Sequence, residues 1–505
     1  MPAIPAGDRE DCVATTDAAV PSTPQSIEPF HIEQHGIDFI PENERWAKPY
    51  DLFGLWAGAS LQVEYFIYGA ILMTFGFTFA QAVSIIVIGN ISYFLLGICS
   101  LQGPDAGTTV FGINRAAYGP NGSRAIATLN WLTMVGFEIE GLILIVGAAL
   151  VLTMKAGFGV GDPAKAVYIL LAVAIQFVLP FLGHATMVKV LRGLVFPFAF
   201  VFAMFLGLSV KHAQLNLGQQ GAGWSMYMVG LAFTIVLSGL GWAECGNDYT
   251  RYLPRNASKK AIVGWVFAGT AIPEILVMTL GAVVGTFIMG VGGSQVSAFV
   301  PFMYQSSIPA WFVVAFLIFA IVQLFAINSL DLYSSGVTLQ AMGLRVKRYQ
   351  AVAIDSVLCL GVTYWAVFDS TFTHFLTDFV DLVIIWIAPW MAIYLVDWAL
   401  RRFRYVAAEL QRTGRDGLYW RQGGVYWPAI VAQVLGMMAA MSALSTSFSV
   451  PDWAHPVTVH TGGADFSIFL GVAVAGLVYF LLGKKGVHSQ ADAQDRLLAN
   501  GAPPG

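Results

Sequence analysis

Charged residues are scarce in this sequence. Lys, Arg, Asp and Glu make up only 11% of the 505 residues, whereas 57% are apolar and the mean hydropathy is +0.68. Soluble domains carry about 25% charged residues, so a fold packed in water does not account for this balance. Runs near 20 apolar residues, long enough to cross a bilayer as helices, recur along the chain. The sequence therefore predicts an all-α polytopic membrane protein.

Motifs of metal binding, catalysis and nucleic-acid recognition are also absent. The four cysteines show no CxxC or Cys/His spacing, and the eight histidines are scattered. Neither a Gly-x-Ser-x-Gly motif nor a phosphate-binding loop occurs. The basic residues form short clusters instead of one stripe, and the net charge is -4. We therefore expect no enzyme activity, no cofactor, no metal and no nucleic-acid partner.

About twelve apolar segments are expected to span the membrane. They start near residues 51, 79, 126, 166, 194, 226, 261, 310, 351, 374, 425 and 465. Of the 26 Lys and Arg residues, only Lys155, Lys165 and Lys211 belong to loops on one side, and the others belong to loops or tails on the opposite side. By the positive-inside rule, we expect a multi-pass protein of the cell membrane with both termini in the cytoplasm.

The two ends of the chain differ in composition from its middle. Residues 1–44 are polar and acidic and contain proline, without the basic start and apolar core of a signal peptide. We expect a flexible cytoplasmic tail over 1–44, a transmembrane domain over 45–485 in contact with the lipid bilayer, and a cytoplasmic C-terminal tail over 486–505.

Two of the apolar segments are interrupted by small residues. The first contains Gly58-Ala59-Ser60, and the sixth contains Ser238-Gly239-Leu240-Gly241. Because the two lie five crossings apart, a repeat of that length enters the membrane from opposite sides and gives an inverted pair. Broken helices expose backbone groups near the midplane, where secondary transporters bind substrates and ions. The alternative is that these glycines only allow helices to pack closely.

A carboxylate, Glu64, follows the first interruption in the string WAGASLQVEYFIYG. An acid at the centre of a membrane helix costs roughly 2.5 to 3.5 kcal/mol, so such residues face a bundle interior and have a function there. Glu64 is therefore a candidate site residue. The alternative is that it lies near a helix end or pairs with a basic residue.

Five stretches of the sequence form a set that extends over roughly residues 45 to 485. They are WAGASLQVEYFIYGAILMTFGFTFAQAVSIIVIGN, GPDAGTTVFGINRAAYG, GWAECGNDYTRYLPRNASKK, NSLDLYSSG and IAPWMAIYLVDWALRR. Together they resemble the nucleobase:cation symporter-1 family, the purine and cytosine permeases. The resemblance implies a LeuT-type fold with helices one and six broken. In that fold two inverted five-helix repeats, at about 51–212 and 226–398, precede two extra helices at about 425–484. It also implies alternating access, with the substrate between spans one, three, six and eight.

The resemblance also implies where the substrate binds. Phe137 stands in span three where the family usually has a Trp that stacks on the base, and Trp242 in span six is the candidate for the opposite face. Stacking on aromatic rings suits flat heterocycles. Asn328 in span eight can both donate and accept hydrogen bonds, as the edge of a nucleobase requires. Ser60 and Gly239, at the two breaks, complete this part of the candidate set.

Several neighbouring polar positions remain open. Glu138 and Glu140 diverge by about 200 degrees around a helix, so at most one of them points at the centre, and the sequence does not separate them. Asp331 is either a substrate ligand or part of an interior ion pair. Gly141 stands where several relatives have an amide, so that hydrogen bond must come from elsewhere. Asp248 is expected to have a structural role.

The coupling ion is expected to be a proton. Sodium-coupled members of the family carry Ser or Thr one turn before the position of Asn328, whereas this sequence has Ala326 and Ile327, and a hard cation needs oxygen ligands. A carboxyl group in a medium of low dielectric holds its proton more tightly than in water, so Glu64 is the candidate proton carrier. The expected function is import of a nucleobase of the cytosine or purine type, or a related heterocycle.

Two alternatives remain at this point. The interior acids suit a cationic substrate as well, such as a thiamine-like or guanidinium compound; they are Glu64, Glu138, Glu140, Glu244 and Asp331. From a different class of protein, a channel or receptor would share the composition, and saturable uptake with counterflow would exclude it.

Overall fold

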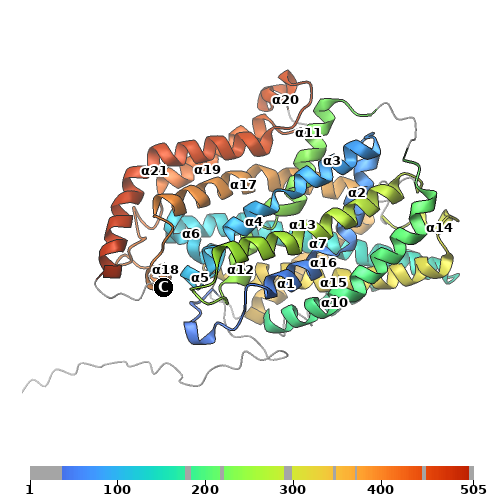
Figure 1. Ribbon diagram of the computed structural model, residues 1–505, viewed down its shortest axis with the longest axis horizontal. Helices are drawn as coiled ribbons and strands as arrows, with labels where there is room; N and C mark the ends of the chain where they lie inside the picture. Colours follow the sequence, from blue (N-terminus) through green and yellow to red (C-terminus); the bar gives the residue numbers. More distant parts are fainter. Residues whose placement is uncertain are drawn as a thin grey trace, which may run out of the picture.

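The computed structural model describes residues 37–176, 184–215, 221–288, 298–344, 348–369, 372–445 and 451–499. Within these ranges every regular element is a helix. The long helices run beside one another along the longest axis of the molecule (Figure 1). Most of the predicted N-terminal tail, residues 1–36, and the last six residues lie outside the described part of the chain.

All twelve predicted spans correspond to helices or to chains of short helices. These are α1 (Asp51–Ser60) with α2 (Val63–Thr74), α3 (Phe79–Asn90) with α4 (Tyr93–Cys99), α7 (Pro120–Lys155), α8 (Asp162–Gln176), α10 (His184–Ser209), α11 (Trp224–Ile235) with the π-helix η3 (Val236–Leu240), the 3-10 turn η4 (Ala243–Cys245) and α12 (Gly246–Thr250), α13 (Lys259–Gly285), α15 (Ala310–Ala341), α16 (Arg348–Asp369), α17 (Phe372–Leu400), α19 (Trp427–Ser442) and α21 (Ser467–Ala499). Eight of the described segments are long and apolar enough to cross a membrane, and three shorter apolar helices accompany them. The chain is therefore a multi-pass membrane protein, as predicted.

Short helices fill the connections between the spans. They are η1 (Glu42–Glu44), α5 (Gly103–Ala106), α6 (Val110–Tyr118), η2 (Val210–His212), α14 (Pro301–Tyr304), α18 (Ala407–Gln411), η5 (Asp452–Ala454) and α20 (Pro456–His460). The loop before α6 is anchored to α12. Asp248 accepts a hydrogen bond from the first backbone N–H of α6, on Val110, at 3.2 Å, and Asn247 accepts one from Gly103 N at 2.7 Å. Asp248 thus caps a helix, which is a structural role.

The break in the first span lies two residues later than predicted. α1 ends at Ser60, and Gln62 is extended with φ -127 and ψ 156 before α2 begins. The freed N–H of Val63 donates to the side-chain oxygen of Gln323 on α15 at 2.9 Å. Gly58 packs instead against α10, because a Cβ there would lie 2.6 Å from the carbonyl oxygen of Leu191. For this glycine, close packing is the correct interpretation.

The break in the sixth span lies where the sequence predicts it. Ser238 has non-helical angles, φ -103 and ψ -123, between α11 and α12. The second span is also interrupted, between α3 and α4, although Ile91 and Ser92 keep helical backbone angles. We did not predict this interruption. The two breaks touch, since Gly239 N donates to Ser92 Oγ at 3.0 Å and a Cβ at Gly239 would lie 2.2 Å from the backbone of Ser92.

The packing of the spans follows an inverted repeat. α2 of span one, in the first repeat, packs on α13 of span seven, in the second repeat. Likewise η3 of span six, in the second repeat, packs on α4 of span two, in the first repeat. Exchanging the two five-span repeats converts one of these pairs into the other. Spans three and eight, α7 and α15, pack extensively on each other. This arrangement agrees with the predicted fold of two inverted five-helix repeats.

The ends of the described chain are packed, not free. Ile40 is buried and its N–H donates to Gly107 O at 2.8 Å, so residues 37–44 of the expected N-terminal tail lie against the bundle. At the other end α21 passes residue 485 without interruption and ends at Ala499. Gln490 and Gln494 on this continuation are buried. α17, α19 and α21 lie side by side (Figure 1).

Candidate functional site

Three carboxylates from three different spans lie close together beside the first break. Glu64 is in the first turn of α2 and only 7% exposed, and the charges of Glu140 on α7 and Asp331 on α15 both act on it. In the described part of the chain, none of the three forms an ion pair with Lys, Arg or His. One oxygen of Glu140 and one of Asp331 are buried without a hydrogen-bond partner. The cluster is therefore rich in acceptors that lack donors.

The structure distinguishes Glu138 from Glu140. Glu140 accepts a hydrogen bond from the Tyr68 hydroxyl of α2 and so faces the helix that carries Glu64. Glu138 turns to the other side of α7 and accepts one from Cys359 Sγ of α16 at 3.2 Å. This divergence follows from their spacing of two on a helix. Of the two candidates, Glu140 is the one beside the acidic cluster.

Asn328 lies directly over Gly141. Its Nδ2 donates to the backbone oxygen of Glu138 at 3.0 Å, and its Oδ1 is buried without a partner. A Cβ added at Gly141 would be 2.1 Å from that Oδ1. The space beside Gly141 is thus taken by the amide of Asn328. Asn130, on the same helix, instead bonds to Thr338 at 3.1 Å and joins α7 to α15.

The two candidate stacking residues, Phe137 and Trp242, lie beside the break in span six. Phe137 is half-buried, contacts Phe379 edge to face at 4.9 Å between ring centroids, and lies 3.7 Å from the Cβ position of Gly241. Trp242 follows that glycine, is half-buried, and donates from Nε1 to the Tyr65 hydroxyl at 2.8 Å. Both rings therefore border the same short stretch of irregular backbone.

The other candidates are buried at the two breaks. Ser60 is the last residue of α1 and 2% exposed. Gly239 is enclosed by Ser92 of the second span, so its position in the structure is a packing position. Glu244, with both oxygens buried and unpartnered, lies within reach of the charge on Asp331. Across the described ranges, no three His, Cys, Asp or Glu side chains come together as a metal site would require.

Glu274 is one of the buried carboxylates that the sequence analysis did not single out. Glu274 of α13 is fully buried and accepts hydrogen bonds from the Tyr93 hydroxyl and from Ser238 Oγ. Its sequence signal is the same as that of Glu64, an acid in the middle of an apolar span, here in the string AIPEILVM. The reasoning applied to span one would have identified it.

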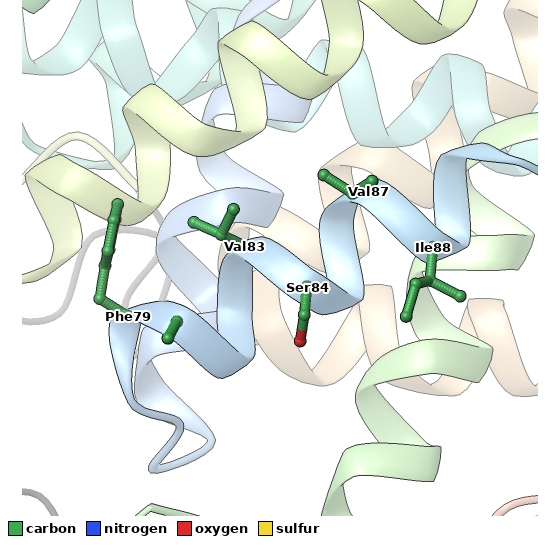
Figure 2. A pocket seen from close by; sticks show the side chains of 6 residues that line it. Phe79, Val83, Ser84, Val87 and Ile88 are labelled. Atoms are coloured by element: carbon green, nitrogen blue, oxygen red, sulfur yellow. The ribbon is translucent and has the colours of Figure 1, made fainter.

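The outer surface of α3 carries a hollow that is not part of this site. Figure 2 shows five of its six lining side chains with labels, and all six belong to one helix: Phe79, Ala80, Val83, Ser84, Val87 and Ile88. The only polar one, Ser84, bonds to the Tyr227 hydroxyl at 2.8 Å. Val87 and Ile88 are 42% and 45% exposed, as is ordinary for a helix face turned toward lipid.

Comparisons with known proteins agree with this architecture. The sequence profile described as "Permease for cytosine/purines, uracil, thiamine, allantoin" matches residues 39–471. The chain is 27% identical over 485 residues to the putative purine-cytosine permease YxlA of Bacillus subtilis, covering 92% of this chain and 99% of that protein. It is 24% identical over 479 residues to the purine-cytosine permease fcyB of Emericella nidulans, covering 90% and 88%.

Solved structures share the fold. Mhp1, described as a nucleobase-cation-symport-1 family transporter and solved in a closed conformation with bromovinylhydantoin bound, superposes with a TM-score of 0.64 at 20% identity, covering 95% of this chain and 97% of Mhp1. Its inward-facing conformation gives a TM-score of 0.65 at 18% identity, covering 92% and 99%. The profile match extends over most of the chain, and both conformations of Mhp1 share its fold. The chain therefore belongs to the nucleobase:cation symporter-1 family of membrane transporters, the permeases for cytosine and purines, uracil, thiamine and allantoin.

Proposed function

We propose that the chain imports a nucleobase of the cytosine or purine type, or a related heterocycle, by alternating access. One observation carries this proposal: Asn328 Oδ1, Glu140 Oε2 and Asp331 Oδ1 are buried acceptors without donors. Buried polar groups in proteins are almost always hydrogen-bonded, so these atoms favour a ligand that brings several N–H groups. Cytosine, adenine and guanine bring ring and amino N–H groups on a flat ring, which Phe137 and Trp242 can cover.

The proposed coupling ion is the proton. Ala326 and Ile327 provide only apolar side chains and belong to the same buried apolar cluster as Trp56 and Ala59 of α1. Sodium would find no hydroxyl ligands there, whereas a proton needs only a carboxylate such as Glu64. The membrane potential supplies roughly 2.3 kcal/mol per charge per 100 mV, enough for about 40-fold accumulation.

Replacing Glu64 by glutamine is expected to remove one proton's contribution to the pH dependence of uptake. In the wild type, uptake rises as external pH falls, by up to about tenfold per pH unit for one bound proton. Glutamine imitates the protonated form and cannot titrate, so the profile of the variant is flatter. The measurement is uptake of radiolabelled cytosine and adenine in cells lacking their own permeases. Uptake into proteoliposomes that follows an imposed sodium gradient and ignores a proton gradient would contradict the proposal.

A cationic substrate is the second candidate, because Glu64, Glu140 and Asp331 have no cationic partner in the described part of the chain. Competition separates the two. Neutral bases that displace the labelled substrate while thiamine and guanidinium compounds do not would support the first candidate, and the reverse pattern would support the second.

We further propose that both termini lie in the cytoplasm of a cell-membrane protein, with repeats at about 51–212 and 226–398. The distribution of Lys and Arg supports this orientation. Single cysteines placed at Phe158, in the exposed loop after α7, and at the exposed Arg404, in a cysteine-free background, test it. An impermeant thiol reagent added to intact cells is expected to label the first and not the second.

A further inference from the structure

Glu274 occupies a junction of several spans. It belongs to α13, a continuous helix, and is fully buried. One of its oxygens accepts a hydrogen bond from the Tyr93 hydroxyl and the other accepts one from Ser238 Oγ. Tyr93 is the first residue after the break in span two, and Ser238 is the non-helical residue of span six. A single carboxyl group thus bonds to the backbone breaks of two other helices through their side chains.

A chain of hydrogen bonds leads from this carboxyl group to the candidate substrate site. The Tyr93 hydroxyl is 3.0 Å from the Tyr65 hydroxyl of α2. Tyr65 in turn accepts a hydrogen bond from Trp242 Nε1 at 2.8 Å. The sequence of contacts is therefore Trp242, Tyr65, Tyr93, Glu274. It begins at a ring that we place against the substrate and ends at a group that can take up a proton.

The helices packed against α13 carry few charged or titratable groups. On the helices packed against α13, and within the side chains that the structure describes, they are Asp51 of α1, Glu64, Tyr65 and Tyr68 of α2, Tyr93 and Cys99 of α4, and Lys189 and Arg192 of α10. Asp51 pairs with Arg192 at 3.0 Å, and Lys189 is exposed. The charges of Glu64 and Glu274 both act on Tyr65, which links the junction to the acidic cluster. Within the described ranges Glu274 forms no ion pair.

The direction of the hydrogen bonds depends on the proton of Glu274. An indole N–H only donates, an ionised carboxylate only accepts, and a phenol does both. With Glu274 ionised, all donors point one way: Trp242 donates to Tyr65, Tyr65 to Tyr93, and Tyr93 to Glu274. Each of these four side chains then finds its hydrogen-bond partner within the series.

Protonation of Glu274 on the oxygen that faces Tyr93 reverses part of this chain. The carboxyl group now donates to the Tyr93 oxygen, so Tyr93 no longer has an acceptor in Glu274. Trp242 Nε1 only donates, so the two phenols hold two hydrogens but have only one contact between them, the one that joins Tyr65 to Tyr93. The hydrogen of either Tyr93 or Tyr65 must therefore be donated to a group outside this series. When the proton is on the other oxygen of Glu274, the carboxyl group donates to Ser238 Oγ. The hydroxyl hydrogen of Ser238 must then find a new acceptor at the break of span six.

We propose that Glu274 is a second proton-binding site, distinct from Glu64, whose protonation couples the arrangement of the broken spans two and six to the residue that stacks on the substrate. The proposal rests on the function proposed above. In it, protonation of Glu274 controls the conformational change that carries the substrate across the membrane, whereas protonation of Glu64 controls substrate binding. The proton is taken from water on one side of the membrane and released to water on the other, so no further reactant is needed.

Two measurements on purified full-length protein test this assignment. The first is the carboxyl C=O band in pH-difference infrared spectra without substrate, which reports protonation directly. The second is the maximal rate of cytosine uptake into proteoliposomes, compared across pH with the dissociation constant of cytosine. The variants are Glu274→Gln, which removes the titrating group, and Tyr93→Phe, which keeps it and cuts the chain. Tyr118→Phe is the matched control, because Tyr118 is an equally buried tyrosine whose hydroxyl bonds to Gln433, at 2.9 Å.

We expect one infrared band to vanish in Glu274→Gln and to remain in Tyr93→Phe and Tyr118→Phe. The maximal rate is expected to vary with pH by up to about tenfold per unit in the wild type and in Tyr118→Phe, and by less than about twofold in Glu274→Gln and Tyr93→Phe. The step in the pH dependence of cytosine binding that we assign to Glu64 is expected to remain in all variants.

Other outcomes overturn the assignment. An unchanged set of infrared bands in Glu274→Gln would exclude protonation of Glu274. A wild-type rate profile in Tyr93→Phe would exclude coupling through the chain, and this variant keeps the test valid should Glu274→Gln fail to fold. A wild type that binds none of the bases would instead overturn the proposed function, while the infrared comparison would still decide whether Glu274 takes up a proton.

Discussion

Gly141→Ala is expected to weaken substrate binding by roughly 5- to 150-fold, since a disrupted buried polar contact costs about 1 to 3 kcal/mol and each 1.4 kcal/mol is tenfold. The added Cβ would lie 2.1 Å from Asn328 Oδ1 and 2.7 Å from both Cγ and Nδ2. No rotation of the methyl group relieves this overlap, so the amide must leave its position. It then loses its hydrogen bond to the backbone of Glu138 and no longer presents its free oxygen to the site.

A double-mutant cycle shows whether the loss passes through Asn328. In an Asn328→Ala background the amide is already gone, so Gly141→Ala should add little, and the two effects should be far from additive. Gly264→Ala is the control, because a Cβ at that helical glycine meets no atom within 4 Å. The readout is the dissociation constant of the transported base. Additive losses would mean that Gly141 acts through another neighbour.

Arg401→Met is expected to lower the free energy of unfolding by about 3 to 5 kcal/mol, the usual cost of leaving one partner of a buried ion pair alone. Arg401 Nε donates to Asp397 at 2.7 Å, and both side chains are 0% exposed. The same guanidinium donates to Ala116 O at 2.8 Å and to Gln490 at 2.9 Å, so it joins α17 to α6 and α21. Methionine fills part of the volume and leaves the carboxylate of Asp397 without its counter-charge.

The next residue provides the control for this prediction. Arg402 pairs with Asp492 and Asp495 on the same helix α21, but it is 51% exposed. Surface ion pairs contribute little to stability, so Arg402→Met should barely shift the thermal unfolding of detergent-solubilised protein. Equal shifts of the unfolding temperature in the two variants would show that the buried ion pair contributes no more to stability than the exposed one.

The sequence was sufficient for the architecture because membrane spans are long and their composition is extreme. Each predicted start lies at or near a helical segment, and the sixth-span break was placed correctly from its glycines. The first break was misplaced by two residues because tertiary contacts decide it. Gly58 is small to admit α10, whereas the chain opens at Gln62, where Gln323 of another repeat receives the freed N–H.

The candidate site was less accessible from the sequence. Spacing alone shows that Glu138 and Glu140 diverge, but which of them meets α2 depends on the rotation of α7 within the bundle, and only the contacts of Tyr68 and Cys359 reveal it. The space that Asn328 takes over Gly141 likewise depends on how closely α7 and α15 approach. The break in span two depends on its contact with span six, so no local pattern predicts it.

The contact between Gly239 and Ser92 constrains how this transporter can move. Because Gly239 has no side chain, the backbone of span six rests on the backbone of span two and its N–H bonds to Ser92 Oγ, so neither helix can bend there without displacing its neighbour. Spans two and six belong to different repeats, yet at this depth they share one pivot. Any motion that exposes the site to the opposite face of the membrane must either turn both helices together about that point or separate them completely.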